Sequence, residues 1–131
     1  MEFGITDREM RILLKSQKGE LEGVMMYKAL ADVVDDPKDA EVFKQLAAEE
    51  GHHAAVFRKI TKKDVVPGKV TSFLLPRLYK LIGRERLYPI IANGEYAADK
   101  TYGPLAEIFT EVQEVKSDEK RHGDTVMGLL G

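Results

Sequence analysis

Apolar residues recur at steps of three and four along most of the chain, the spacing that places them on one face of an α-helix. Thr6 and Glu9 form a predicted capping box, because a hydroxyl and a Glu three residues later can each bond the other's backbone N–H. A first helix is therefore expected from there to about Val34. Asp35-Asp36-Pro37 then supplies a stop, a cap and a proline at the first position of a second helix, which is expected to end near Ile60.

The second half of the chain continues the helical pattern after a break at residues 65–68. Residues 71–82 predict a short amphipathic crossover helix, and residues 84–109 predict a third long helix with a kink at Pro104. A second predicted capping box, which begins at Thr110, opens a fourth helix that continues nearly to the C-terminus. Four long helices with one long connection predict an all-α bundle, with residues 1–131 forming a single domain.

An internal repeat relates the two halves of the chain. Each half contains a Gly-Glu pair, a tyrosine seven residues after that Glu and, further on, a Glu-x-x-His sequence. The residues are Gly19, Glu20, Tyr27, Glu50 and His53 in the first half, and Gly94, Glu95, Tyr102, Glu119 and His122 in the second. Each half is therefore predicted to be a helical hairpin that contributes one lone Glu and one Glu-x-x-His.

The positions of these acids predict that they meet. The midpoint between Glu20 and Glu50 falls at Asp35, inside the predicted turn, and the midpoint of the corresponding pair in the second half falls close to Thr110. In every helix the acid lies on the apolar face that should point inward. Four carboxylates and two imidazoles are therefore expected to converge in the bundle core at one level.

Four buried carboxylates need compensating charge, because an ionised carboxylate is costly to remove from water and neighbouring carboxylates repel one another. The charge of two divalent cations balances that of four glutamates, and neutral histidines complete the coordination. A Glu from each of two helices and a Glu-x-x-His from the other two is the ligand set of di-iron and di-manganese bundles. Oxygen and imidazole ligands favour iron or manganese and also accept zinc. The predicted metal ligands are Glu20, Glu50, His53, Glu95, Glu119 and His122.

Several polar residues near these positions have more than one interpretation. Tyr27 and Tyr102 follow their Glu by two helical turns, so each phenol is expected either to hold a ligand carboxylate or to lie in the core bonded elsewhere. Glu49 and His52 form a third Glu-x-x-His on a more polar stripe, which we interpret as a flank of the site, with His52 as an alternative ligand. Glu22 is expected on the solvated face.

Composition and charge exclude other classes of protein. The chain has 20 Lys and Arg against 22 Asp and Glu, a net charge of −2, so it has no basic surplus for binding nucleic acid. The absence of cysteine excludes a disulfide scaffold, thiolate metal sites and a cysteine nucleophile, and it suits a reducing compartment. The acidic first residues and the short apolar runs predict neither a secretory signal nor a membrane span. We therefore expect a cytoplasmic protein.

The repeated Gly-Glu-x6-Tyr segments, with the two Glu-x-x-His sequences, resemble the rubrerythrin branch of the ferritin-like superfamily over about residues 10–130. The resemblance implies a ferritin-like four-helix bundle, two iron ions per chain bridged by Glu50 and Glu119, and oxidation of ferrous iron by hydrogen peroxide or dioxygen. Rubrerythrins proper carry a C-terminal rubredoxin domain with cysteines; this sequence has none, so an external electron donor is expected in trans. They also tend to place a second Glu where Ala98 stands here, followed by Asp99.

These features support one leading hypothesis and one alternative. The first is a non-haem di-iron or di-manganese oxidoreductase of the peroxide-scavenging or ferroxidase type, with catalytic residues Glu20, Glu50, Glu95, Glu119, Tyr27 and Tyr102. The alternative, suggested by Ala98, is an iron-binding or storage protein without catalytic turnover. Residues 71–82 are cationic and apolar, and packing across the bundle or in a homodimer is favoured over docking on a membrane or partner. Exchange of hairpins between two chains is also open.

Overall fold

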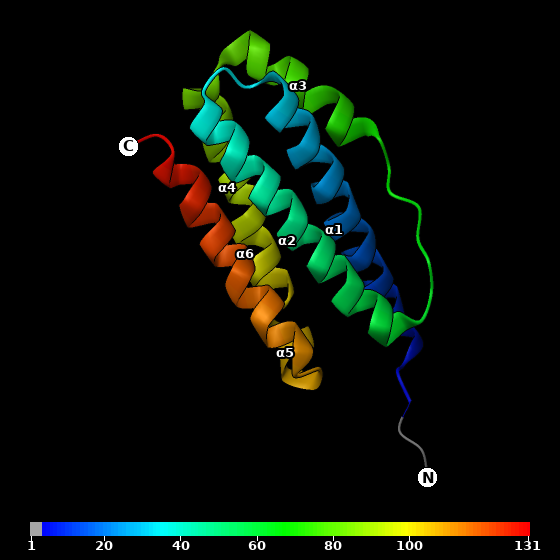
Figure 1. Ribbon diagram of the computed structural model, residues 1–131. Coiled ribbons are helices and arrows are strands. Elements are labelled where there is room, and N and C mark those ends of the chain that lie inside the picture. Colours follow the sequence, from blue (N-terminus) through cyan, green and yellow to red (C-terminus); the bar gives the residue numbers. More distant parts are fainter. Residues whose placement is uncertain (1–3) are drawn as a thin grey trace.

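The computed structural model describes residues 4–131, which form six helices and no strand in that range (Figure 1). α1 and α2 form one antiparallel hairpin and α4 and α6 form the other, while α3 crosses over between them (Figure 1). The predicted all-α bundle with a crossover between its second and third long helices is confirmed. The first three residues, on which the expectation about a secretory signal partly rests, lie outside the described range. The helices are α1 (Asp7–Val33), α2 (Pro37–Thr61), α3 (Val70–Ile82), α4 (Arg84–Thr101), α5 (Gly103–Ile108) and α6 (Glu111–Gly128).

The first hairpin begins its helices where the sequence predicts. The Glu9 N–H donates to Thr6 Oγ1 at 3.1 Å and the Thr6 N–H donates to Glu9 Oε1 at 2.9 Å, so the predicted capping box is confirmed. Asp36 Oδ1 accepts a bond of 2.8 Å from a backbone N–H in the first turn of α2, and Pro37 occupies the first position of that helix. Both caps satisfy donors that a helix leaves free at its N-terminus.

The second hairpin departs from the prediction in two places. Instead of one helix kinked at Pro104, α4 ends at Thr101 and the short α5 begins at Gly103. The reason is that proline has no N–H for the helical ladder and its ring crowds the preceding turn. The predicted capping box at Thr110 is wrong, because this residue has helical backbone angles and makes no side-chain cap bond. A capping side chain needs an extended backbone at its own position, which the tight connection from α5 to α6 does not provide.

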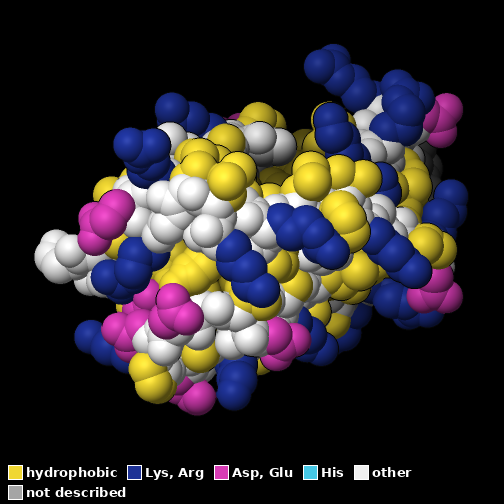
Figure 2. Space-filling view, turned by 90° about the horizontal axis from the view of Figure 1, so that it is seen from above, with side chains coloured by type: hydrophobic (Ala, Val, Ile, Leu, Met, Phe, Trp, Pro, Cys, Tyr) yellow, Lys and Arg dark blue, Asp and Glu magenta, His cyan; other side chains and the backbone are white. Residues whose placement is uncertain are grey.

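The crossover helix α3 is apolar on two sides. Its inner side packs against the core, and the Tyr79 hydroxyl accepts a bond of 3.1 Å from the Asp35 N–H in the α1–α2 turn. Packing across the bundle, which the sequence favoured for this segment, is confirmed. The outer side exposes Val70, Phe73, Leu74 and Leu81, and the view from above shows hydrophobic and basic side chains intermingled on this end of the molecule (Figure 2). Among residues 4–131, no helix combines the length and apolar character needed to cross a membrane.

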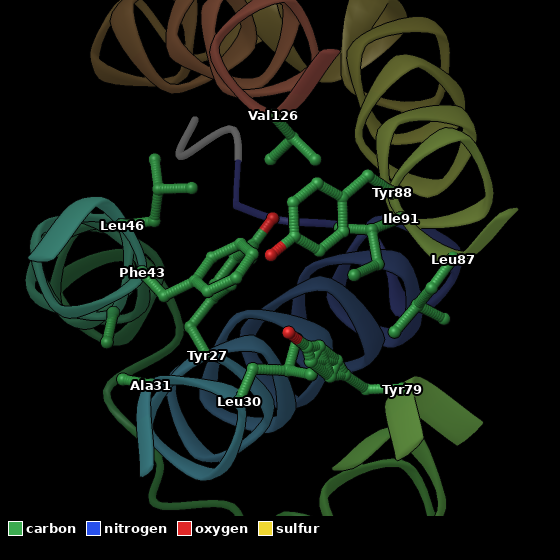
Figure 3. Packing of buried hydrophobic residues seen from close by; sticks show 11 residues of the cluster. Tyr27, Leu30, Ala31, Phe43, Leu46, Tyr79, Leu87, Tyr88, Ile91 and Val126 are labelled. Atoms are coloured by element: carbon green, nitrogen blue, oxygen red, sulfur yellow. The ribbon is translucent and has the colours of Figure 1, made fainter. Parts of the chain in front are cut away.

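Two apolar clusters enclose a polar layer in the middle of the bundle. In the cluster near α3, Phe43 stacks on Tyr27 with ring centroids 5.7 Å apart and meets Tyr88 edge to face at 5.3 Å (Figure 3). The cluster at the other end includes Leu13 and Phe57. Each of the long helices α1, α2, α4 and α6 contributes to both clusters, with its predicted ligands between them. The candidate site is therefore sealed above and below by closely packed side chains.

Candidate metal centre

Six polar side chains meet in the layer between the two apolar clusters, and each is at most 8% exposed. They form two groups of four, and within each group one possible ligand atom per residue lies within 4.8 Å of the others. The groups are Glu20, Glu50, His53 and Glu119, and Glu50, Glu95, Glu119 and His122. The structure thus brings together all six residues singled out in the sequence, and Glu50 and Glu119 belong to both groups.

Each histidine bonds the lone Glu of its own half of the repeat. His53 Nδ1 lies 2.8 Å from Glu20 Oε1, and His122 Nδ1 lies 3.0 Å from Glu95 Oε2, so both pairs are at hydrogen-bond distance. The two imidazole rings lie nearly parallel, with centroids 5.5 Å apart. Both Nδ1 atoms therefore face the carboxylates at the centre of the bundle.

The other ring nitrogen of each histidine bonds an acid of the opposite half. The His53 Nε2–H donates to Asp118 Oδ2 at 2.8 Å, and the His122 Nε2–H donates to Glu49 Oε1 at 3.0 Å. Arg121 donates to both of these acids. Sequence reasoning placed Glu49 at the flank of the site but missed Asp118. The repeat itself contained the indication, because each acid directly precedes the Glu of a Glu-x-x-His.

This outer layer orients the rings and carries negative charge. Burial opposes ionisation of Glu49, but hydrogen bonds from Arg121 and His122 outweigh it and lower the pKa of this carboxyl. Bonds from His53 and Arg121 outweigh burial in the same way and lower the pKa of Asp118. A carboxylate that accepts from Nε2 directs Nδ1 toward the centre and makes it a better ligand.

Two of the inner carboxyl groups, those of Glu20 and Glu119, retain protons when no cation balances their charge. Burial raises the pKa of Glu20 to about 8 and, in the same way, the pKa of Glu119 to about 8. Burial disfavours the charged form of His122, but hydrogen bonds to neighbouring carboxylates outweigh it and raise its pKa to about 11. The pKa of His53 moves upward for the same reasons. A cation that binds here must therefore displace protons.

Two carboxylate oxygens at the centre form no hydrogen bond with residues 4–131, although one of them, Glu119 Oε1, lies 3.0 Å from His53 Nδ1. Within the described part of the chain, Glu50 Oε2 and Glu119 Oε1 are buried and make no hydrogen bond. Buried unpaired oxygens are uncommon in proteins, and both belong to the residues shared by the two groups. Carboxylate oxygens and imidazole nitrogens are also the donors that iron and manganese accept. The residues present fit a pair of divalent cations.

The two repeat-related tyrosines differ in their contacts. The Tyr102 O–H donates to Glu20 Oε2 at 3.0 Å, so this tyrosine holds a carboxylate, which is one of the two expected arrangements. Tyr27 is buried, and its hydroxyl has no hydrogen-bond partner among residues 4–131. Burial and the nearby charge of Glu95 raise the pKa of Tyr27, so its hydroxyl lies close to the corresponding Glu of the other half. For Tyr27, neither of the two expected hydrogen bonds is present among the described residues.

Three other candidates lie away from the centre. His52 is on the exposed side of α2, which does not support the alternative of a seventh ligand. Asp99 forms an ion pair of 2.7 Å with Lys116. Glu22, expected on a solvated face, is partly buried and accepts a bond of 2.7 Å from the Gly68 N–H.

Ala98 occupies the position at which the resemblance leads one to expect a second carboxylate. Its side chain packs against the cluster that contains Leu13 and Phe57. Together with Tyr102 it lines a groove of about 430 Å³ between α1 and α4–α5. Asp99, one residue further along α4, is engaged by Lys116 and does not replace the missing group.

Fold and site together define a ferritin-like carboxylate bundle with a candidate binuclear metal centre. The sequence profile of the Rubrerythrin family matches residues 11–130, and the chain belongs to this family of di-iron oxidoreductases. Reverse rubrerythrin-1 of Clostridium acetobutylicum is 30% identical over 118 residues, which cover 86% of this chain. The chain spans 60% of the length of that relative. No solved structure matches the chain significantly.

Proposed function

We propose that this protein is a non-haem di-iron oxidoreductase that oxidises bound ferrous iron with hydrogen peroxide or dioxygen. The observation that carries the proposal is the pair of four-residue groups that share two carboxylates with unpaired oxygens. Manganese and zinc accept the same donors and are the competing ions. We assign Glu20 and His53 to one ion, Glu95 and His122 to the other, and Glu50 and Glu119 to both.

Two ferrous ions in such a site supply the two electrons that reduce hydrogen peroxide to water, together with the positive charge that polarises the oxidant. Other residues of the chain hold the assigned ligands in position. The Tyr102 O–H fixes one oxygen of Glu20, and Asp118 and Glu49 fix the two imidazole rings. The apolar clusters on either side limit the access of water.

The oxidised centre must be reduced again before a second turnover. The sequence contains no cysteine to hold a rubredoxin-type iron, so we propose an external electron donor that acts in trans. All six assigned ligands come from one chain. A homodimer without exchanged hairpins would duplicate this centre, whereas exchange of hairpins would build each centre from residues of two chains.

Mixing the anaerobic ferrous protein with hydrogen peroxide in a stopped-flow spectrometer tests the proposal. We expect about two iron ions per chain and their oxidation within seconds. Iron that stays ferrous for minutes would contradict the proposed activity. The double substitution Glu50→Ala, Glu119→Ala is the control, because it removes both shared carboxylates and should abolish nearly all metal binding.

The alternative is an iron-binding or storage protein, and Ala98 is the observation in its favour, because a carboxylate is missing there. Storage predicts iron uptake well beyond about two ions per chain and a large hollow oligomer in solution. Iron titration combined with light scattering distinguishes the two. A small assembly that saturates at about two ions per chain supports the oxidoreductase.

A further inference from the structure

Five glycines lie in the interior of long helices close to the centre, and three of them line a common hollow: Gly19 and Gly23 in α1 and Gly94 in α4. Gly19 and Gly94 are the repeat-related residues that precede Glu20 and Glu95. Glycine destabilises a helix interior relative to alanine. Three glycines in these positions therefore need an explanation other than helix stability.

All three glycines line one hollow of about 310 Å³ between α1, α3 and α4. Glu95, one of the assigned ligands, lines the same hollow. A Cβ atom added at Gly19 or Gly94 would meet no other atom within 4 Å, so the space in front of both residues is open. The remaining walls are mainly apolar and include Met26, Leu75, Ile90 and Ile91.

Gly23, which lines this hollow, lies directly against the carboxylate of Glu50. A Cβ atom added at Gly23 would lie 3.4 Å from Cδ and 3.6 Å from Oε2 of Glu50. That Oε2 is the atom that makes no hydrogen bond within residues 4–131, and Glu50 is only 1% exposed. Any side chain at Gly23 would stand between the hollow and this unpaired oxygen.

We therefore propose that the hollow is the port through which the oxidant reaches the metal centre, and that it admits small neutral molecules such as hydrogen peroxide or dioxygen. This inference rests on the proposed function. The volume is ample for molecules of this size, since one water occupies about 30 Å³ in the liquid. The apolar walls cannot replace the hydration shell of a charged ion, so neutral molecules enter at lower cost.

The crossover helix forms the outer wall of this port, and a glycine contact sets its position. Glu22, at the edge of the hollow, accepts from the Gly68 N–H just before α3. A Cβ atom at Gly68 would lie 2.7 Å from Oε2 of Glu22, so a side chain there would push the Glu22 carboxylate aside. Thr71 and Leu75 of α3 then line the hollow opposite the helix-interior glycines.

Nitric oxide is a suitable probe, because it is small and neutral and binds ferrous iron without needing peroxide chemistry. The variant Gly94→Leu places a side chain in open space at the port without replacing an assigned ligand. We expect it to slow nitric oxide association with the ferrous protein by about tenfold, which corresponds to about 1.4 kcal/mol of added barrier. Iron content and helical circular dichroism should stay at the wild-type level, and oxidation by hydrogen peroxide should slow by a similar factor.

The matched control is Thr101→Leu, which fills the groove beside Tyr102 and should leave both rates unchanged, because that groove shares only Gly19 with the port. The proposed port would be contradicted if Gly94→Leu bound nitric oxide at the wild-type rate, or if only Thr101→Leu bound it more slowly. If Gly94→Leu loses iron, Thr71→Leu, from α3 on the opposite wall of the port, repeats the test with the same two outcomes. If Gly94→Leu slows nitric oxide association but hydrogen peroxide does not oxidise the wild-type ferrous protein, the port is supported and the proposed function is contradicted.

Discussion

Tyr102, in the second half of the internal repeat, donates a hydrogen bond of 3.0 Å to Glu20 in the first half. Its counterpart Tyr27 points its hydroxyl toward the same polar layer and finds no partner among the described residues. The two halves are thus alike in the ligands they offer and unlike in the bonds that support those ligands. This difference allows the role of a tyrosine hydroxyl to be tested within one protein.

Replacement of Tyr102 by Phe should destabilise the metal-free protein by about 1–3 kcal/mol, because Glu20 Oε2 loses a buried hydrogen bond. The matched variant Tyr27→Phe removes a hydroxyl that is already unpaired and should leave stability unchanged or slightly higher. Urea unfolding of both variants measures the difference. Equal losses in the two proteins would show that the bond to Glu20 does not matter.

Asp118→Asn and Glu49→Gln should each weaken metal binding by about 10- to 100-fold, because they alter the acceptor that orients a histidine ring. Competition with a coloured chelator measures the affinity. Glu114→Gln, an exposed acid on the same helix as Asp118, is the control and should bind metal as the wild type does. An equal loss in the control would indicate a general effect of net charge.

The metal-free protein should lose stability as the pH rises from about 5 to about 8. The pKa values of Glu20 and Glu119 rise from 4.5 to about 8 on folding, so the folded state binds more protons in this window. Each retained proton contributes a slope of up to about 1.4 kcal/mol per pH unit. His122 acts in the same direction, because its raised pKa gives stability that is lost between pH 6.5 and about 11.

Urea unfolding at several pH values checks this dependence. Metal-loaded protein should show the opposite trend, because bound cations replace the protons and compete better with them as the pH rises. Greater stability of the metal-free protein at about pH 8 than at about pH 5 would contradict the proton-holding cluster.

Arg84→Ala should destabilise the fold by about 2–3 kcal/mol, because it leaves the buried charge of Asp39 with only the Tyr88 hydroxyl. Arg84 also donates to the Leu129 carbonyl and so ties α4 to the end of α6. The control is Arg58→Ala, which breaks a fully exposed pair and should not change the unfolding midpoint. Similar losses in both variants would contradict the importance of burial.

Much of the fold followed from the sequence because its helix boundaries depend on local chemistry. The caps at Thr6 and Asp36 involve residues three or fewer positions apart, and both are present as predicted. The break near Pro104 also has a local cause, because proline interrupts helical hydrogen bonding. The sequence did not predict that the helix would end and a short helix, α5, would begin there. Whether a proline kinks or ends a helix depends on the residues that pack around it. In this structure the short connection between α5 and α6 gives Thr110 helical backbone angles, so its side chain does not cap α6.

By itself, the sequence determined that helices would form, that each would carry its acid on an apolar face, and that two hairpins would bring six ligand side chains together. These properties depend on the spacing of apolar residues and on an internal repeat, and both can be identified in the sequence alone. Only the tertiary structure decided which residues support the ligands, such as Asp118 beside His53, and which glycines line a hollow beside Glu95. Such relationships join helices that are distant in sequence, and they depend on side-chain distances that no periodicity specifies.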